Sequence, residues 1–264
     1  MTELLSSYPF RLGTTSYIIP EDLVNNAYFL ASKVNDIELI LFNLESEKTN
    51  FPDEDTILNL NRISREHDLT YTVHLPKDLQ VGDHAAEHIS LIQANTVIQS
   101  TRQLSPWAYI THLDGREIRQ NLTSSRYTDW IDQACYTLQI VGDLAGGMDK
   151  IALENLEGYP INFLEPVIDH LPISLCVDIG HLWLDNMDPI PYLQKHIART
   201  KVIHLHGIHQ RDHASLAHMP ITLVDELFHL ILESNYTGVL TLEVFNEEDF
   251  QSSMQMIQAV ANRS

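Results

Sequence analysis

The chain has 264 residues, of which 44% are hydrophobic, enough for one large domain or two small ones. Its 36 acidic residues outnumber its 16 Lys and Arg residues, and the formal net charge at pH 7 is −20. Such a charge repels nucleic acid and anionic membrane surfaces, so neither is an expected partner.

The start of the chain, MTELLSSYPFRLG, lacks the basic and apolar regions of a secretory signal. No apolar run approaches the roughly 20 residues that span a membrane. The two cysteines, Cys135 and Cys176, fall in a helical and a strand pattern and form no disulfide framework. We therefore expect a cytoplasmic protein in which both cysteines are buried apolar residues.

Strand and helix patterns alternate along the whole chain. The strand patterns are short, aliphatic and β-branched, as in buried parallel strands, and Pro20 and Gly146 mark the start of one helix and the end of another. The predicted strands cover residues 11–18, 36–43, 69–75, 107–113, 150–156, 174–180, 201–206 and 238–246. The predicted helices cover about 20–34, 52–67, 83–104, 125–144, 160–170, 189–199, 223–234 and 247–262.

Eight strand–helix units in 264 residues predict an α/β protein, a single (β/α)8 barrel domain over residues 1–264. The alternative is an open, doubly wound parallel sheet. No Gly-rich phosphate-binding turn follows the first predicted strand, and its absence disfavours that alternative.

Residues able to bind a metal gather at the carboxyl ends of the predicted strands. In a closed barrel these ends meet at one mouth, where the active site of the fold lies. The polar residues continue the inward-facing alternation of their strands, as His112 does with Ile110 and Ala108. The predicted metal ligands are His74, His112, Glu154, Asp178, His181, His204, His213 and Glu243, and His206 and Asp212 lie in the same region.

A single inward histidine at a strand end is more often a hydrogen-bonded core residue than a ligand, and Asp178 and His181 also suit strand-end caps. Many imidazoles and carboxylates in one mouth, however, repel one another or stay unsatisfied without a cation. The pattern therefore predicts a divalent metal site. Mixed imidazole and carboxylate ligation favours Zn, Mn, Fe or Co over Ca or Mg.

At these residues the chain resembles the xylose-isomerase-like barrels, which include sugar and sugar-phosphate isomerases and epimerases and the endonuclease IV group of metal phosphodiesterases. The resemblance follows the whole chain in strand order. It is most specific at Glu154 in ALENLEG, Asp178-x-x-His181, His204 in IHLHG and Glu243 in TLEVFN. In the isomerase branch it implies that Glu154, Asp178, His204 and Glu243 bind one divalent ion and that the two glutamates move a proton between carbons.

The resemblance to the endonuclease IV group implies additional ligands. His74 and His112 match its early-strand histidines, and His181 matches its strand-six histidine. Asp212-His213 matches the pair in its strand-seven loop. Together with the shared residues these make almost the whole three-metal ligand set of that group.

The chain departs from the endonuclease IV pattern in this loop. The family places an Asp two residues before the His, but here Arg211 holds that position and Asp212 adjoins His213. His206-Gly207 also stands where the family often has Asn-Asp or His-Asp. Both departures change the residues that the family uses as loop ligands, and these ligands hold the third metal in the endonuclease IV group.

Positive side chains just beyond the strands suit a small phosphorylated substrate. Lys77, Arg116 and Arg211 follow the third, fourth and seventh strands, and with His206 they are the predicted substrate-binding residues. The alternative is that these charges are ordinary solvated surface residues. DNA is a poor fit in either case, because only 16 basic residues stand against 36 acidic ones.

The strings FRLGTTSYIIPEDL, DIELILFN, LTYTVHLP and VIHLHG are also similar to the cobamide-remodelling phosphodiesterases of this superfamily. We therefore predict a metal-dependent hydrolase of a small or medium organic phosphodiester, such as a cobamide, with one to three Zn or Mn ions. The predicted catalytic residues are Glu154, Glu243 and Asp178. The alternatives are a one-metal sugar or sugar-phosphate isomerase or epimerase and a catalytically inactive ligand-binding barrel, and a homo-oligomer is compatible with each.

Overall fold

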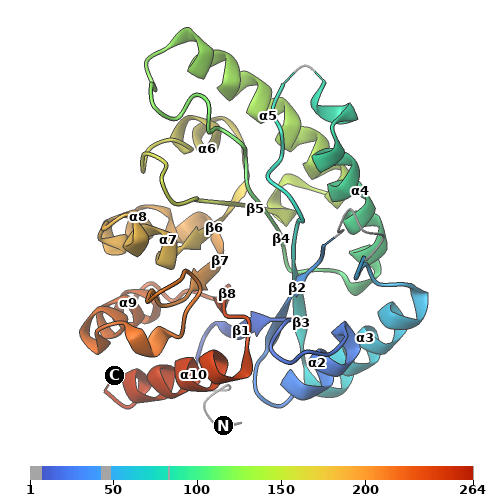
Figure 1. The fold of residues 1–264 in the computed structure, drawn as a ribbon, viewed down its shortest axis with the longest axis vertical. Coiled ribbons are helices and arrows are strands. Elements are labelled where there is room, and N and C mark those ends of the chain that lie inside the picture. The colour runs from blue at the N-terminus through green and yellow to red at the C-terminus, as the bar shows by residue number, and fades with distance from the viewer. Residues whose placement is uncertain (1–7, 43–48, 83, 264) are drawn as a thin grey trace.

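A computed structural model describes residues 8–42, 49–82 and 84–263 of the chain. Its eight parallel strands close into a barrel in sequence order, and helices surround the strands (Figure 1). The predicted (β/α)8 barrel is therefore confirmed. The strands are β1 (Arg11–Thr15), β2 (Asp36–Ile40), β3 (Thr70–His74), β4 (Tyr109–Thr111), β5 (Ile151–Glu154), β6 (Ser174–Asp178), β7 (Thr200–Leu205) and β8 (Val239–Leu242).

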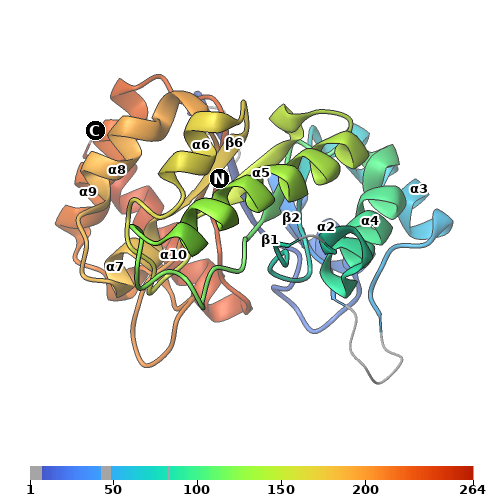
Figure 2. The ribbon, with the colours of Figure 1, turned by 90° about the horizontal axis from the view of Figure 1, so that it is seen from above.

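The helices form an outer layer around the barrel, which Figure 2 shows from above. The α-helices are α2 (Leu23–Leu30), α3 (Glu54–His67), α4 (Ile89–Thr101), α5 (Ser125–Ala145), α6 (Glu165–His170), α7 (Ile179–Leu184), α8 (Pro189–His196), α9 (Ile221–Glu233) and α10 (Glu247–Ala261). Short 3-10 turns are η1 (Ala85–Glu87), η2 (Arg102–Leu104), η3 (Met148–Lys150), η4 (Ile197–Arg199) and η5 (Leu216–His218). Within the described residues, no helix is both long and apolar enough to cross a membrane.

Several predicted elements are longer than the observed ones, such as the fourth strand, predicted over 107–113 and observed over Tyr109–Thr111, and at β6 a side chain explains the difference. The sixth predicted strand reaches Gly180, but β6 ends at Asp178, because the Asp178 carboxylate caps α7 by accepting the backbone N–H of His181 at 2.7 Å. Gly146 ends α5 in a left-handed conformation, as predicted. Residues 1–7, residue 43 of the second predicted strand and residue 83 of the third predicted helix lie outside the described residues.

Two apolar clusters hold the barrel together. The larger one lies between the strands and the helices and contains most of the buried side chains. The smaller one fills the barrel interior with compact side chains. Its members are Ala108, Ile110, Ala152, Cys176, Val202 and Val239. The polar residues at the strand ends therefore lie over a packed apolar floor, as is usual for this fold.

Candidate metal centre

The predicted ligands meet at the carboxyl end of the barrel because parallel strands in register bring their ends together. Asp178 of β6 pairs in register with His204 of β7, and His74 ends β3. Glu154 ends β5, and Glu243 directly follows β8. These strands place the side chains of residues far apart in sequence around one point.

Glu154, Asp178, His204 and Glu243 form what we call the central group. One potential ligand atom from each lies within 4.8 Å of those of the others. His204 Nδ1 is 3.0 Å from Glu243 Oε2, 3.3 Å from Glu154 Oε1 and 3.7 Å from Asp178 Oδ2. All four residues are buried. Three carboxylates and one imidazole around a common point form a donor set for a divalent cation.

His74, His112 and Glu154 form a second set, the histidine group. The Nε2 atoms of His112 and His74 lie 3.0 Å and 3.5 Å from Glu154 Oε2. The histidine group thus uses one oxygen of Glu154, while the other oxygen faces the central group. Glu154 would therefore be a ligand for an ion in either group.

Asp178, His181, His206 and His213 form a third set, the loop group. His206 Nε2 is 3.3 Å from Asp178 Oδ1, so Asp178 joins this set to the central group. Asp212, the other predicted loop ligand, lies beside it, with Oδ2 3.2 Å from His213 Nδ1 and 3.9 Å from His181 Nε2. The loop residues therefore reach the mouth despite their altered spacing.

Buried polar atoms without a hydrogen bond in these groups fit metal ions. Within the described part of the chain, buried atoms without a hydrogen-bond partner are concentrated here. Leaving such atoms unpaired costs about 1–3 kcal/mol each, and more for charged groups. Divalent ions would satisfy them together. The atoms are His112 Nε2, Glu154 Oε2, Asp178 Oδ2, His204 Nδ1, His206 Nε2 and Glu243 Oε2.

The carboxylates and imidazoles of the site stabilise each other's charged forms. Burial alone would raise the pKa of Glu154, but His204 and His112 hold it well below its usual range. Burial lowers the pKa of His112, yet the carboxylates of Glu154 and Asp78 outweigh burial and raise it to about 10. In the metal-free site, protons on imidazoles thus compensate the carboxylates, a role that a bound cation would take over.

Hydrogen bonds fix which ring nitrogen faces the centre. The Nδ1–H groups of His74 and His181 donate to the carbonyl oxygens of Leu75 and Asn155, at 2.9 Å and 3.0 Å. His112 Nδ1 lies 3.1 Å from Asp78 Oδ1. In each ring, Nε2 is thereby left to face the mouth. Such outer contacts orient metal-binding histidines and set their tautomers.

Two glycines let the loop group pack closely. A Cβ added to Gly180 would overlap the ring of His206, and one added to Gly207 would overlap the backbone of Ser215. The His206-Gly207 departure from the endonuclease IV pattern therefore has a steric reason. His206 itself is fully buried, so the structure places it among the candidate ligands and not on the predicted surface open to substrate.

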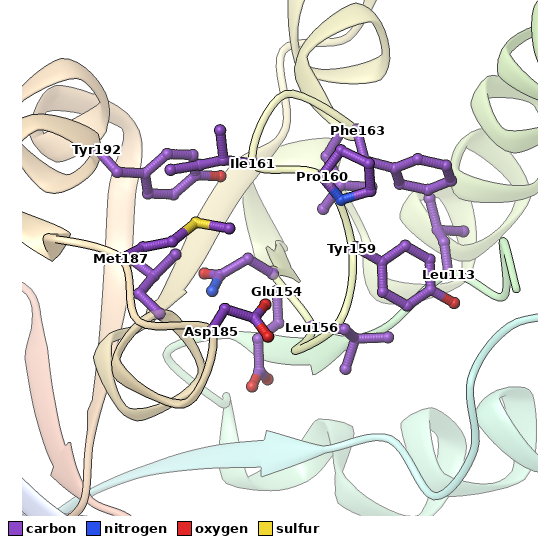
Figure 3. Close-up of a pocket in the computed structure, with 13 residues that line it drawn as sticks. Leu113, Glu154, Leu156, Tyr159, Pro160, Ile161, Phe163, Asp185, Met187 and Tyr192 are labelled. Carbon is purple, nitrogen blue, oxygen red and sulfur yellow. The ribbon is translucent and has the colours of Figure 1, made fainter. Parts of the chain in front are cut away.

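A cavity of about 600 Å³ opens above the groups and has a size usual for ligand sites. Its wall includes His74, His112, Glu154, His181, His213 and Glu243, together with Lys77, Arg116 and Arg119. A second, more apolar pocket beside Glu154 has room for only about 20 Å³ (Figure 3). Tyr159, Ile161, Phe163 and Met187 line it. The larger cavity is therefore the place for a substrate.

Of the three predicted substrate-binding cations, two form ion pairs with acidic side chains and one of these lies outside the cavity wall. Arg116 is in its wall, but its guanidinium forms an ion pair with Asp114 at 2.6 Å. Arg211 forms an ion pair with Asp249 and does not line the cavity. Lys77 lies in the cavity wall.

The sequence-based prediction does not include several residues of the site, among them Arg119, Asp78 and Glu38. Arg119 lies in the cavity wall, with its guanidinium 4.9 Å from the centre of the Tyr159 ring. Asp78 contacts His112, and Glu38 contacts His204. A signal for Glu38 is present, because a charged residue in the aliphatic string DIELI stands where a buried strand normally carries an apolar side chain.

The whole barrel matches a known family and known structures. The family model described as xylose isomerase-like TIM barrel matches residues 32–260. A D-tagatose 3-epimerase-like protein has a TM-score of 0.76 at 18% identity, covering 96% of this chain and 97% of the other. A search among curated proteins found no match to the chain.

Two more similar structures belong to enzymes named for different activities. For 3-keto-D-glucoside 4-epimerase from E. coli the TM-score is 0.69 at 14% identity, over 96% of this chain and 99% of that one. For endonuclease IV from Thermus thermophilus the TM-score is 0.71 at 14% identity, and the match covers 96% of this chain and 100% of that one. At such identities the structures share the fold alone. Because the family model spans most of the sequence, the chain belongs to the xylose isomerase-like TIM-barrel family.

Proposed function

We propose that the chain is a metal-dependent hydrolase of a small or medium organic phosphodiester. The observation that carries this proposal is the linkage of three ligand groups in one mouth. Glu154 belongs to both the histidine group and the central group, and Asp178 belongs to both the central group and the loop group. Neighbouring ions about 3.5–4 Å apart suit phosphodiester cleavage, since they stabilise both the attacking and the leaving oxygen.

The donor sets fit Zn or Mn better than Ca or Mg because each mixes imidazole and carboxylate ligands. When bound, such ions lower the pKa of water toward ~7 and offset negative charge on phosphoryl oxygens. Glu154 and Glu243 reach the cavity from its floor, where either carboxylate orients the attacking water. Asp178 is fully buried, so its role is to hold metal and to keep the loop group in place.

The cations in the cavity wall suit the phosphate group of the substrate. Lys77 and Arg119 both line the cavity, and neither forms an ion pair within the described residues. We assign phosphate binding to these two residues, because Arg116 and Arg211 are already neutralised by Asp114 and Asp249. The net charge of −20 opposes a nucleic-acid substrate, and the similarity to cobamide-remodelling phosphodiesterases makes a cobamide the first candidate.

The experiment is a hydrolysis assay on protein loaded with Zn or Mn. Cobamides and a simple aryl phosphodiester serve as substrates, and chelated protein is the control. We expect cleavage that depends on added metal. If metal-loaded protein left every phosphodiester intact while it isomerised or epimerised a ketose, the hydrolase proposal would be wrong.

A sugar or sugar-phosphate isomerase or epimerase is the second candidate. Two of the similar structures described above are an epimerase and an epimerase-like protein. The central group alone would hold the single ion of such an enzyme, and Glu154 and Glu243 would move a proton between adjacent carbons. In this case His74 and His112 would contact substrate or have no role in the reaction.

A further inference from the structure

We propose that Glu38 is a positioning residue of the metal centre. Its carboxylate accepts the Nε2–H of His204 and so directs Nδ1 of the same ring at the central group, where Nδ1 would be the nitrogen that gives up its proton to bind a metal ion. The inference rests on the metal centre and not on the reaction proposed for it, so it applies equally to a hydrolase and to an isomerase.

The contact crosses the barrel interior. Glu38 lies on β2 and His204 on β7, two strands that are not neighbours in the sheet. Glu38 Oε2 is 2.8 Å from His204 Nε2, and both side chains are 0% exposed. A buried carboxylate at this place is costly unless it is paired, so its presence needs a reason beyond packing.

The two nitrogens of His204 have different surroundings. Nε2 meets the single carboxylate of Glu38, whereas Nδ1 meets oxygens of Glu154, Asp178 and Glu243 within 3.7 Å. A neutral imidazole carries one N–H, and only the unprotonated nitrogen binds a metal. With its proton on Nε2, the ring donates to Glu38 and presents Nδ1 to the central group. The opposite tautomer would set a lone pair against the Glu38 carboxylate.

A second role for Glu38 must be distinguished from this one. Glu38, His74 and Glu243 also have potential ligand atoms within 4.8 Å of one another, so Glu38 could itself bind an ion. Its Oε2 is already engaged by His204, and only Oε1 lacks a hydrogen-bond partner within the described residues. The positioning role uses the contact that is formed, and the ligand role predicts a different number of bound ions.

The test compares Glu38→Ala and Glu38→Gln with the control Asp36→Asn. Asp36 lies two residues earlier on the same strand and is also fully buried, but it accepts hydrogen bonds from Thr70 and Thr72 and contacts no candidate ligand. Zn affinity is measured by competition with a chelator, and ions per chain by elemental analysis. Thermal unfolding of the chelated proteins checks the fold, and the Co(II) absorption spectrum reports the geometry of the bound ion.

We expect Glu38→Ala to weaken Zn binding by ~10–100-fold, the usual effect of removing such an outer contact. The Zn affinity of Glu38→Gln should lie between those of Glu38→Ala and the wild type, because the amide oxygen still accepts the Nε2–H but carries no charge. The Co(II) spectrum should change in both variants, the number of ions per chain should not, and Asp36→Asn should bind Zn like the wild type.

The proposal is overturned if Glu38→Ala binds Zn with wild-type affinity, or if Asp36→Asn weakens binding equally. A loss of one ion per chain would instead make Glu38 a ligand. If Glu38→Ala does not fold, an unchanged affinity and Co(II) spectrum in Glu38→Gln overturns it. These readouts do not involve turnover, so failure of the hydrolase assay would leave the Glu38 result unaffected.

Discussion

Replacement of His112 by Ala separates the two candidate functions most sharply. His112 Nε2 lies 3.0 Å from Glu154 Oε2, and its Nδ1 lies 3.1 Å from Asp78. The change removes one of the three donors of the histidine group and leaves all four donors of the central group. A multi-ion hydrolase should therefore lose one ion per chain, whereas a one-ion isomerase should keep its ion.

The size of the effect follows from what the lost ion contributes. An ion that stabilises transition-state charge is worth several kcal/mol. A loss of ~3 kcal/mol corresponds to a decrease of about 100-fold in the rate of phosphodiester cleavage. The chelated variant should also be less stable by ~1–3 kcal/mol, because Glu154 loses a buried ion-pair partner and Asp78 loses a hydrogen-bond partner. His74→Ala should reduce the metal content and the rate in the same direction.

A matched control exists outside the mouth. His196 on α8 is also buried and lies 2.9 Å from the carboxylate of Glu165. His196→Ala should cost a similar amount of stability and leave both the metal content and the rate unchanged. Elemental analysis and steady-state kinetics measure these quantities. If His112→Ala kept the wild-type metal content and cleavage rate, the two-ion reasoning would be refuted.

Four further outcomes are expected. Chelation should lower the melting temperature, because ions bind the folded protein, and an unchanged value would speak against a metal centre. Arg119→Gln should raise KM for a phosphodiester by about tenfold through loss of a charge-assisted hydrogen bond, whereas Arg211→Gln should not, because Arg211 is paired with Asp249 away from the cavity. Metal affinity should rise from pH 6 to pH 8. Glu154 and Asp78 raise the pKa of His112 to about 10, and a metal ion must displace the proton on this ring. A calorimetric titration that shows no pH dependence of the affinity would contradict this. Binding to an abasic DNA duplex at physiological salt should be negligible, and a submicromolar band shift would disprove the charge-based exclusion.

The barrel could be predicted from sequence because its signals are local. Each strand contains a short, mostly aliphatic run, and Glu154 and Asp178 end their strands in the inward alternation. The strand ends then converge without any knowledge of long-range packing. The end of the sixth strand differs from the prediction only because the Asp178 side chain caps a helix that the local pattern does not indicate.

The remaining features depend on contacts that sequence spacing does not encode. Arg116 and Arg119 are three residues apart in one loop, and only the structure shows that the former is neutralised by Asp114. The burial of His206 depends on Gly180, which lies on another element. Glu38 is separated from its partner His204 by 166 residues. Such pairings follow from barrel closure and side-chain packing, not from any local pattern.

The central claim is that this barrel mouth holds more than one metal ion. Crystals of Zn-loaded protein, with anomalous data collected on both sides of the Zn absorption edge, test it most directly. We predict separate anomalous peaks in the central group and the histidine group, with Glu154 contacting both. A single peak confined to the central group would contradict the multi-ion hydrolase and favour an isomerase or epimerase, and no peak at all would contradict the metal centre itself.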